Sequence, residues 1–243
     1  MLLIDSDETM DAAELVDTAE IPGNGGELQL FKCDEEYSIS IKGSGVLMNT
    51  WAHQSEDALA ELACRKISGR TQPRVLIGGR GRGFTLAAAL RHLGEDAEVV
   101  VAELVPGVVA WNKGVLGQYA KHPLQDKRTT ILEGDVAKRI RSQKQNYDAI
   151  LLDVDNGPNG LTRKKNDWLY STDGLTEAYN SLRPEGILAV WSAATSRNFM
   201  ERLRKVGFKV KQTRVPEQDN KGDLHAIWIA ERGLYSGEGS RCF

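Results

Sequence analysis

The chain has 243 residues, of which 41% are hydrophobic and 27% charged, and its formal net charge is −3. This size fits one full globular domain with a small appendage, and the slight negative charge argues against a general nucleic-acid surface. No apolar run approaches the ~18 residues of a membrane-spanning helix, so we expect no membrane partner.

The three cysteines are widely spaced and show neither a metal-ligand pattern nor an even pairing. The acidic N-terminus lacks the basic region of a secretory signal. We therefore expect a cytoplasmic protein without a metal site.

Residues 1–26 are acidic and end in a glycine-rich turn, which predicts a flexible lead-in. Apolar and polar residues then alternate over 27–49, which predicts a β-hairpin and a third short strand. A sheet this small is not stable alone, so it should pack on the main domain or on a second copy in a homodimer. A linking helix with Ser55 as its N-cap completes a small region that we place at 27–68.

The stretch Arg74 to Leu90 joins a short apolar run, three glycines and an amphipathic run. This order predicts a buried strand, a tight turn and the N-terminus of a helix. Gly79, Gly81 and Gly83 are spaced by two, and glycine is needed where the backbone adopts φ > 0 or approaches a ligand closely.

From this point strands and helices alternate, which predicts a parallel sheet with helices on both faces. The last two strands are too close for a helical crossover, so they should form an antiparallel hairpin. The predicted fold is α/β, with a Rossmann-like, doubly wound, mostly parallel seven-stranded sheet over 69–233 and a tail at 234–243. The later strands are expected at 97–103, 128–132, 147–153, 187–192, 208–215 and 224–231, and the helices at 106–119, 136–142, 173–183 and 196–206.

Acidic residues follow several of these strands, at the edge where doubly wound sheets bind ligands. Glu103, followed by Leu104, ends the second strand and could accept hydrogen bonds from both hydroxyls of a ribose, unless it is merely solvated. The run Gly134-Asp135-Val136 could bind an adenine amine and ring nitrogen, and Asp135 could equally cap a helix. S-adenosylmethionine has the ribose, the adenine and a cationic centre that such a set would bind.

Asp153 and Asp155 end the fourth strand and precede a loop rich in turn residues. Acids in this position could hold the amino acid end of the ligand or accept a proton from a substrate amine. Tyr170 could line the substrate pocket, although an aromatic residue there also fits a core role. These three are the candidate catalytic residues.

The stretch VLIGGRGRG, together with Glu103, the GDV run and YDAILLD at 147–153, resembles the class I S-adenosylmethionine-dependent transferases. The DVDNGP loop at 153–158 and LYSTDGL at 169–175 are most similar to the spermidine synthase-like group. The resemblance implies an enzyme in which Glu103 binds ribose, Asp135 binds adenine and Asp153 acts as general base toward the attacking amine.

Two positions depart from the pattern of that group. Arg82 stands where spermidine synthases carry an Asp that holds the amine of decarboxylated S-adenosylmethionine, and Leu59-Ala60 stands where they carry a Tyr-His pair. A guanidinium suits the carboxylate that only the intact cofactor has, which adds Arg82 to the cofactor-binding candidates. We therefore expect methyl transfer to an amine or other nucleophile, on a small molecule or a protein. The alternatives are aminopropyl transfer to a polyamine from decarboxylated S-adenosylmethionine, and a non-catalytic binding module that retains the fold.

Overall fold

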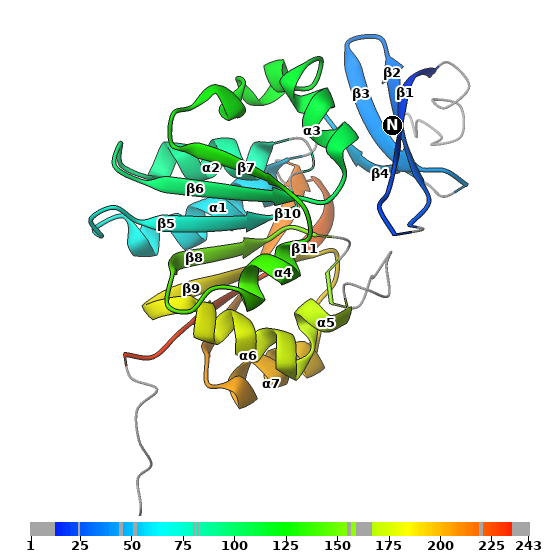
Figure 1. The fold of residues 1–243 in the computed structure, drawn as a ribbon. Coiled ribbons are helices and arrows are strands. Elements are labelled where there is room, and N and C mark those ends of the chain that lie inside the picture. Colours follow the sequence, from blue (N-terminus) through cyan, green and yellow to red (C-terminus); the bar gives the residue numbers. More distant parts are fainter. Residues whose placement is uncertain are drawn as a thin grey trace, which may run out of the picture.

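A computed structural model describes most of the chain and shows a large sheet covered by helices, with a smaller sheet at one end (Figure 1). The described residues are 13–23, 25–43, 46–50, 53–79, 81, 83–154, 157–158, 167–218 and 221–234.

The smaller sheet is antiparallel, in the order β1-β2-β3-β4. Its strands are β1 (Glu14–Glu20), β2 (Glu27–Cys33), β3 (Glu36–Ile41) and β4 (Val46–Asn49). The prediction of a flexible lead-in over 1–26 is wrong for β1, which pairs with β2 along its length. Five of its first six positions are exposed and only Ala19 is buried, so β1 depends on backbone pairing and lacks the alternation that marks a strand in a sequence.

The smaller sheet packs on helix α3 (Pro106–Lys113) of the main domain. Ala19, Leu30 and Ile39 of the sheet share an apolar cluster with Val108 and Trp111 of the helix. The Trp111 indole N–H also donates to the Asp17 carboxylate at 2.7 Å. A small sheet that cannot bury enough apolar surface alone gains it from this helix.

The main sheet has the strand order β10-β11-β9-β8-β5-β6-β7. Its neighbours are parallel from β9 to β7, while β11 is antiparallel to both β9 and β10, so the predicted fold class is confirmed. The strands are β5 (Arg74–Gly78), β6 (Glu98–Glu103), β7 (Thr129–Glu133), β8 (Tyr147–Leu152), β9 (Leu182–Ser192), β10 (Lys209–Gln218) and β11 (Lys221–Glu231).

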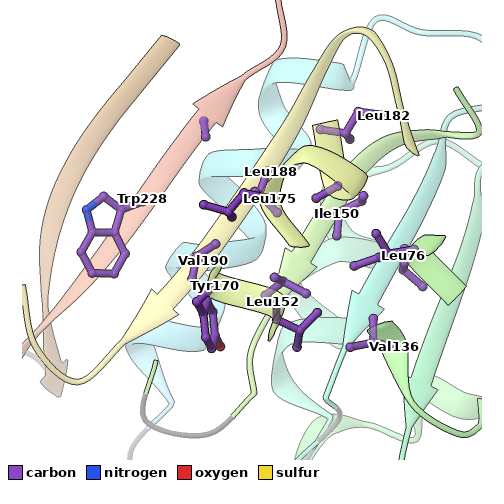
Figure 2. Packing of buried hydrophobic residues seen from close by; sticks show 14 of the residues in the cluster. Leu76, Val136, Ile150, Leu152, Tyr170, Leu175, Leu182, Leu188, Val190 and Trp228 are labelled. Carbon is purple, nitrogen blue, oxygen red and sulfur yellow. The ribbon is translucent and has the colours of Figure 1, made fainter. Parts of the chain in front are cut away.

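Helices cover both faces of this sheet (Figure 1). The remaining helices are α1 (Gln54–Ile67), α2 (Phe84–His92), α4 (Val136–Arg141), α5 (Asp167–Tyr170), α6 (Thr172–Ser181) and α7 (Arg197–Val206), and two 3₁₀ turns are η1 (Gly117–Ala120) and η2 (Pro123–Gln125). The helices α1 and α2 bury one face, and α4 to α7 bury the other. Figure 2 shows the second layer, where Leu76, Ile150 and Val190 of adjacent strands lie near Tyr170 and Leu175 of the helices.

Several element boundaries differ from the sequence prediction. The helix expected at 106–119 ends at Lys113, because Gly114 leaves the helical region and the chain tightens into η1. Ser55 is not an N-cap: α1 begins one residue earlier, and the Ser55 hydroxyl donates to Glu56 from inside the first turn. Within the described residues, no helix is long and apolar enough to span a membrane.

Candidate functional site

The candidate site lies at the carboxyl ends of β5, β6 and β8. The strand β5 is flanked by β6 on one side and β8 on the other, and all three are parallel, so their carboxyl ends meet at one edge. From β5, the chain places β6 and β7 on one side and then β8 and β9 on the other. This reversal of strand order makes the carboxyl end of β5 a topological switch point, where open α/β sheets bind ligands.

The three glycines that follow β5 all have left-handed backbone angles, with φ of +77° at Gly79, +45° at Gly81 and +84° at Gly83. A Cβ atom on Gly79 would lie 2.2 Å from the Asp153 carbonyl oxygen, so no side chain fits there. The same atom on Gly81 would lie 3.2 Å from the Met48 sulfur of β4. The turn is therefore packed between β8 and the smaller sheet, and glycine meets both the angular and the spatial demand. Arg82 lies outside the described residues.

Glu103 ends β6 with its side chain buried, at 7% exposure. Its Oε1 atom accepts a hydrogen bond from the Val105 backbone N–H at 2.8 Å, immediately before α3. The alternative of a solvated acid at a strand end is therefore wrong. Leu104 beside it is partly buried and packs against the apolar cluster under the smaller sheet.

Asp135 is the N-cap of α4, and its Oδ1 accepts the Ala137 backbone N–H at 2.8 Å, as predicted. The preceding Gly134 donates its backbone N–H to the Glu103 carbonyl at 2.7 Å. Val136 is buried against Gly78 of β5, where a Cβ atom would meet its methyl carbon at 2.7 Å. The adenine and ribose candidates are thus joined through the backbone at neighbouring strand ends.

Asp153 follows β8 and is half-buried. Its backbone N–H donates to the Gly78 carbonyl at 2.9 Å, and its Oδ2 accepts the Thr85 hydroxyl at 2.7 Å. Thr85 lies in the first turn of α2, directly after the glycines, so the carboxylate is held beside the turn. The sequence analysis had not singled out Thr85, whose signal is a polar residue in an otherwise apolar helix start.

The two other catalytic candidates are placed differently. Asp155 lies outside the described residues. Tyr170 is only 2% exposed and belongs to the apolar layer shown in Figure 2. Its hydroxyl donates to the Val154 carbonyl at 2.9 Å, so it anchors the chain after β8, and substrate contact by Tyr170 stays a prediction.

Asn112 of α3 is a second residue that the sequence analysis missed. It is 2% exposed and donates from its side-chain amide to the Gly81 carbonyl at 2.8 Å. The available signal was an amide on the apolar side of a helix, one turn after Val108.

This donor and acceptor set fits S-adenosylmethionine. Three carboxylates at neighbouring strand ends suit ribose hydroxyls, an adenine amine and a cation, and they do not suit a phosphate. The glycine turn leaves its backbone close to the same edge. Among the described residues, no group of His, Cys, Asp or Glu side chains is placed to hold a metal ion.

Comparison with known proteins agrees with this geometry. Residues 105–221 match a family described as S-adenosyl-L-methionine-dependent methyltransferase. The polyamine aminopropyltransferase of Sulfolobus acidocaldarius is 28% identical over 133 residues, which cover 55% of this chain and 42% of that protein. The corresponding protein of Saccharolobus solfataricus is 35% identical over 80 residues, or 33% of this chain and 26% of its own.

The crystal structure of spermidine synthase from Thermotoga maritima superimposes with a TM-score of 0.71 and 16% identity, over 91% of this chain and 73% of that one. The chain has the class I S-adenosylmethionine-dependent transferase fold in its spermidine synthase-like form. The resemblance seen in the sequence is confirmed at this level.

The family match covers only part of the site. The methyltransferase family match begins at Val105, so it includes Asp135 and Asp153 but leaves out the glycine turn and Glu103. The chain also matches less than half the length of the two aminopropyltransferases.

Proposed function

We propose that this protein transfers a methyl group from S-adenosylmethionine to an amine or other nucleophile. The observation that carries the proposal is the placement of Glu103 at the end of β6 and of Asp153 directly after β8, on either side of β5 and its glycine turn. The family match over 105–221 supports the same cofactor.

Each part of the cofactor has a proposed partner. Glu103 accepts the ribose hydroxyls, and its fixed carboxylate is already oriented by the Val105 N–H. Asp135 accepts the adenine amine, the Val136 N–H donates to a ring nitrogen, and Leu104 and Gly134 border the same end. The turn from Gly79 to Gly83 receives the amino acid tail, where Arg82 would pair with the carboxylate.

The bound cofactor supplies a carbon made electrophilic by its sulfonium. Asp153 then orients the nucleophile and takes its proton on a carboxylate oxygen, while the Thr85 hydroxyl holds the carboxylate in place. We also propose that Asp155 helps to hold the substrate amine and that Tyr170 lines the substrate pocket. The enzyme contributes mainly positioning and exclusion of water.

Aminopropyl transfer from decarboxylated S-adenosylmethionine is the second candidate, because the curated relatives are named polyamine aminopropyltransferases. One observation weakens it. Leu59 and Ala60 of α1, which stand where spermidine synthases carry a polyamine-binding Tyr-His pair, are completely buried in the apolar cluster between this helix and the main sheet. The acceptor in our proposal is therefore a small-molecule or protein amine other than a polyamine. A cytoplasmic location and a homodimer remain part of the proposal.

Calorimetric titration with each cofactor tests this assignment. Pairing of Arg82 with the carboxylate should make S-adenosylmethionine bind about tenfold to a hundredfold more tightly than its decarboxylated form. The preference should shrink in Arg82→Ala and reverse in Arg82→Asp. Tighter binding of the decarboxylated form by the wild type would favour the aminopropyltransferase, and no binding of either would favour the non-catalytic module.

A further inference from the structure

The buried side chain of Asn112, in α3, forms a hydrogen bond to the glycine turn. Asn112 is 2% exposed, and its Nδ2 donates to the Gly81 carbonyl at 2.8 Å and to the Val108 carbonyl at 2.9 Å. Both N–H groups of this amide are therefore used, one inside its own helix and one across to the turn. A buried amide with two such partners is fixed in one orientation.

The position that Asn112 holds is the middle of the turn. The first glycine is tied to β6, since the Gly79 N–H donates to the Ala102 carbonyl at 3.1 Å. The last glycine is tied to α2, since the Gly83 carbonyl accepts the Ala87 N–H at 2.9 Å. Gly81 lies between them with φ of +45°, and Asn112 bonds its carbonyl.

The helix that carries Asn112 is itself well anchored. Its start is fixed by the Glu103 carboxylate through Val105, and Trp111, next to Asn112, bonds Asp17 of the smaller sheet. The carbonyl of Gly81 is thus bonded to a helix whose N-terminal end is bonded to Glu103, the proposed ribose contact. Rigid support of this kind keeps the backbone groups of a binding turn in place.

We propose that Asn112 is a positioning residue, which sets the backbone of the glycine turn to receive the amino acid tail of the cofactor. The inference rests on the proposed function, because it assumes that the turn receives that tail. In this role Asn112 does not contact the cofactor and takes no part in binding adenine or ribose.

Two ligands that differ only in the tail separate this role from a purely structural one. S-adenosylhomocysteine has the amino acid tail, whereas adenosine has the same base and ribose without it. We expect Asn112→Ala to weaken S-adenosylhomocysteine about tenfold and adenosine less than twofold, measured by calorimetry on the full chain. Asn112→Leu, which keeps a similar volume without the donors, should give the same split.

Asn146→Ala is the matched control, since Asn146 is a partly buried amide that bonds Arg74 at the opposite edge of the sheet. It should change neither affinity. Equal weakening of both ligands by the Asn112 variants, or no weakening, would overturn the positioning role.

Amide hydrogen exchange without ligand separates this inference from the proposed function. Exchange over residues 78–87 should be faster in both Asn112 variants than in the wild type. Faster exchange with no binding of S-adenosylhomocysteine by the wild type would overturn the proposed function and leave the support of the turn intact. Unchanged exchange would overturn that support.

Discussion

The Thr85 hydroxyl donates a hydrogen bond to the Asp153 carboxylate at 2.7 Å, which links the first turn of α2 to the end of β8. Thr85 is almost completely buried, so its hydroxyl has little access to water. The bond fixes the candidate base next to the glycine turn, where a cofactor tail and a nucleophile would meet. This pairing gives the first prediction.

Asp153→Asn should lower turnover by on the order of a hundredfold, because an amide cannot accept the proton of the nucleophile. The fold and most of the cofactor affinity should remain, since the amide oxygen can still accept from Thr85. Steady-state kcat with an amine acceptor found by screening is the measurement, with thermal unfolding as the check on folding. Full turnover in the variant would reduce Asp153 to a structural partner of Thr85.

Glu103 should be tested with two substitutions, because it has two tasks. Glu103→Gln keeps an oxygen for the Val105 N–H but removes the charge, so it should weaken S-adenosylmethionine by ~1.5–3 kcal/mol and leave stability nearly unchanged. Glu103→Ala should lose the same affinity and also destabilise the protein, since the buried Val105 N–H loses its partner. Calorimetry and denaturant unfolding measure both effects. Unaltered affinity in Glu103→Gln would remove Glu103 from the site.

Asp148 should carry a large share of stability at the opposite edge of the sheet. It is 1% exposed and accepts from the guanidinium groups of Arg70 at 2.6 Å and Arg183 at 2.7 Å. Asp148→Asn should lower the free energy of unfolding by about 1.5–3 kcal/mol, because charged hydrogen bonds are lost in a buried place. Glu177→Gln, which breaks an exposed pair with Lys144, should cost at most ~1 kcal/mol. Equal effects of the two substitutions would contradict this assignment.

Asp126 should give the protein an acid-dependent stability. Hydrogen bonds from the Arg128 guanidinium at 2.7 and 2.9 Å lower the pKa of Asp126 to about 2. A pKa lowered by folding stabilises the native state above the unfolded pKa of ~3.9 and loses that effect as the pH falls toward 2. The difference in unfolding free energy between wild type and Asp126→Asn should therefore be largest near pH 7 and shrink between pH 4 and 2. A difference that stays constant over this range would contradict the pairing.

Much of the fold could be read from the sequence because its signals are local. The apolar runs of β5, β6 and β8 and the glycines after β5 need no distant contact to be recognised. The strand β1 was missed because its mostly exposed residues show no alternation of apolar and polar positions. Its pairing with β2 is visible only in the folded structure.

The acidic residues of the site could be predicted from the sequence, but the residues that hydrogen-bond to the site from other elements could not. Glu103, Asp135 and Asp153 follow strands and could be found from that position alone. Thr85 and Asn112 act through partners that are 68 and 31 residues away in the chain, so only the folded structure brings them to the site. The burial of Glu103 likewise depends on how α3 begins.

A calorimetric titration of the wild-type chain with S-adenosylmethionine, beside the same titration of Glu103→Gln, tests the proposed cofactor site most directly. We predict saturable binding at one site per wild-type chain and weaker binding by the Glu103→Gln variant. Absence of binding by the wild type, or equal binding by both proteins, would contradict the assignment of the carboxyl ends of β5, β6 and β8 as the cofactor site.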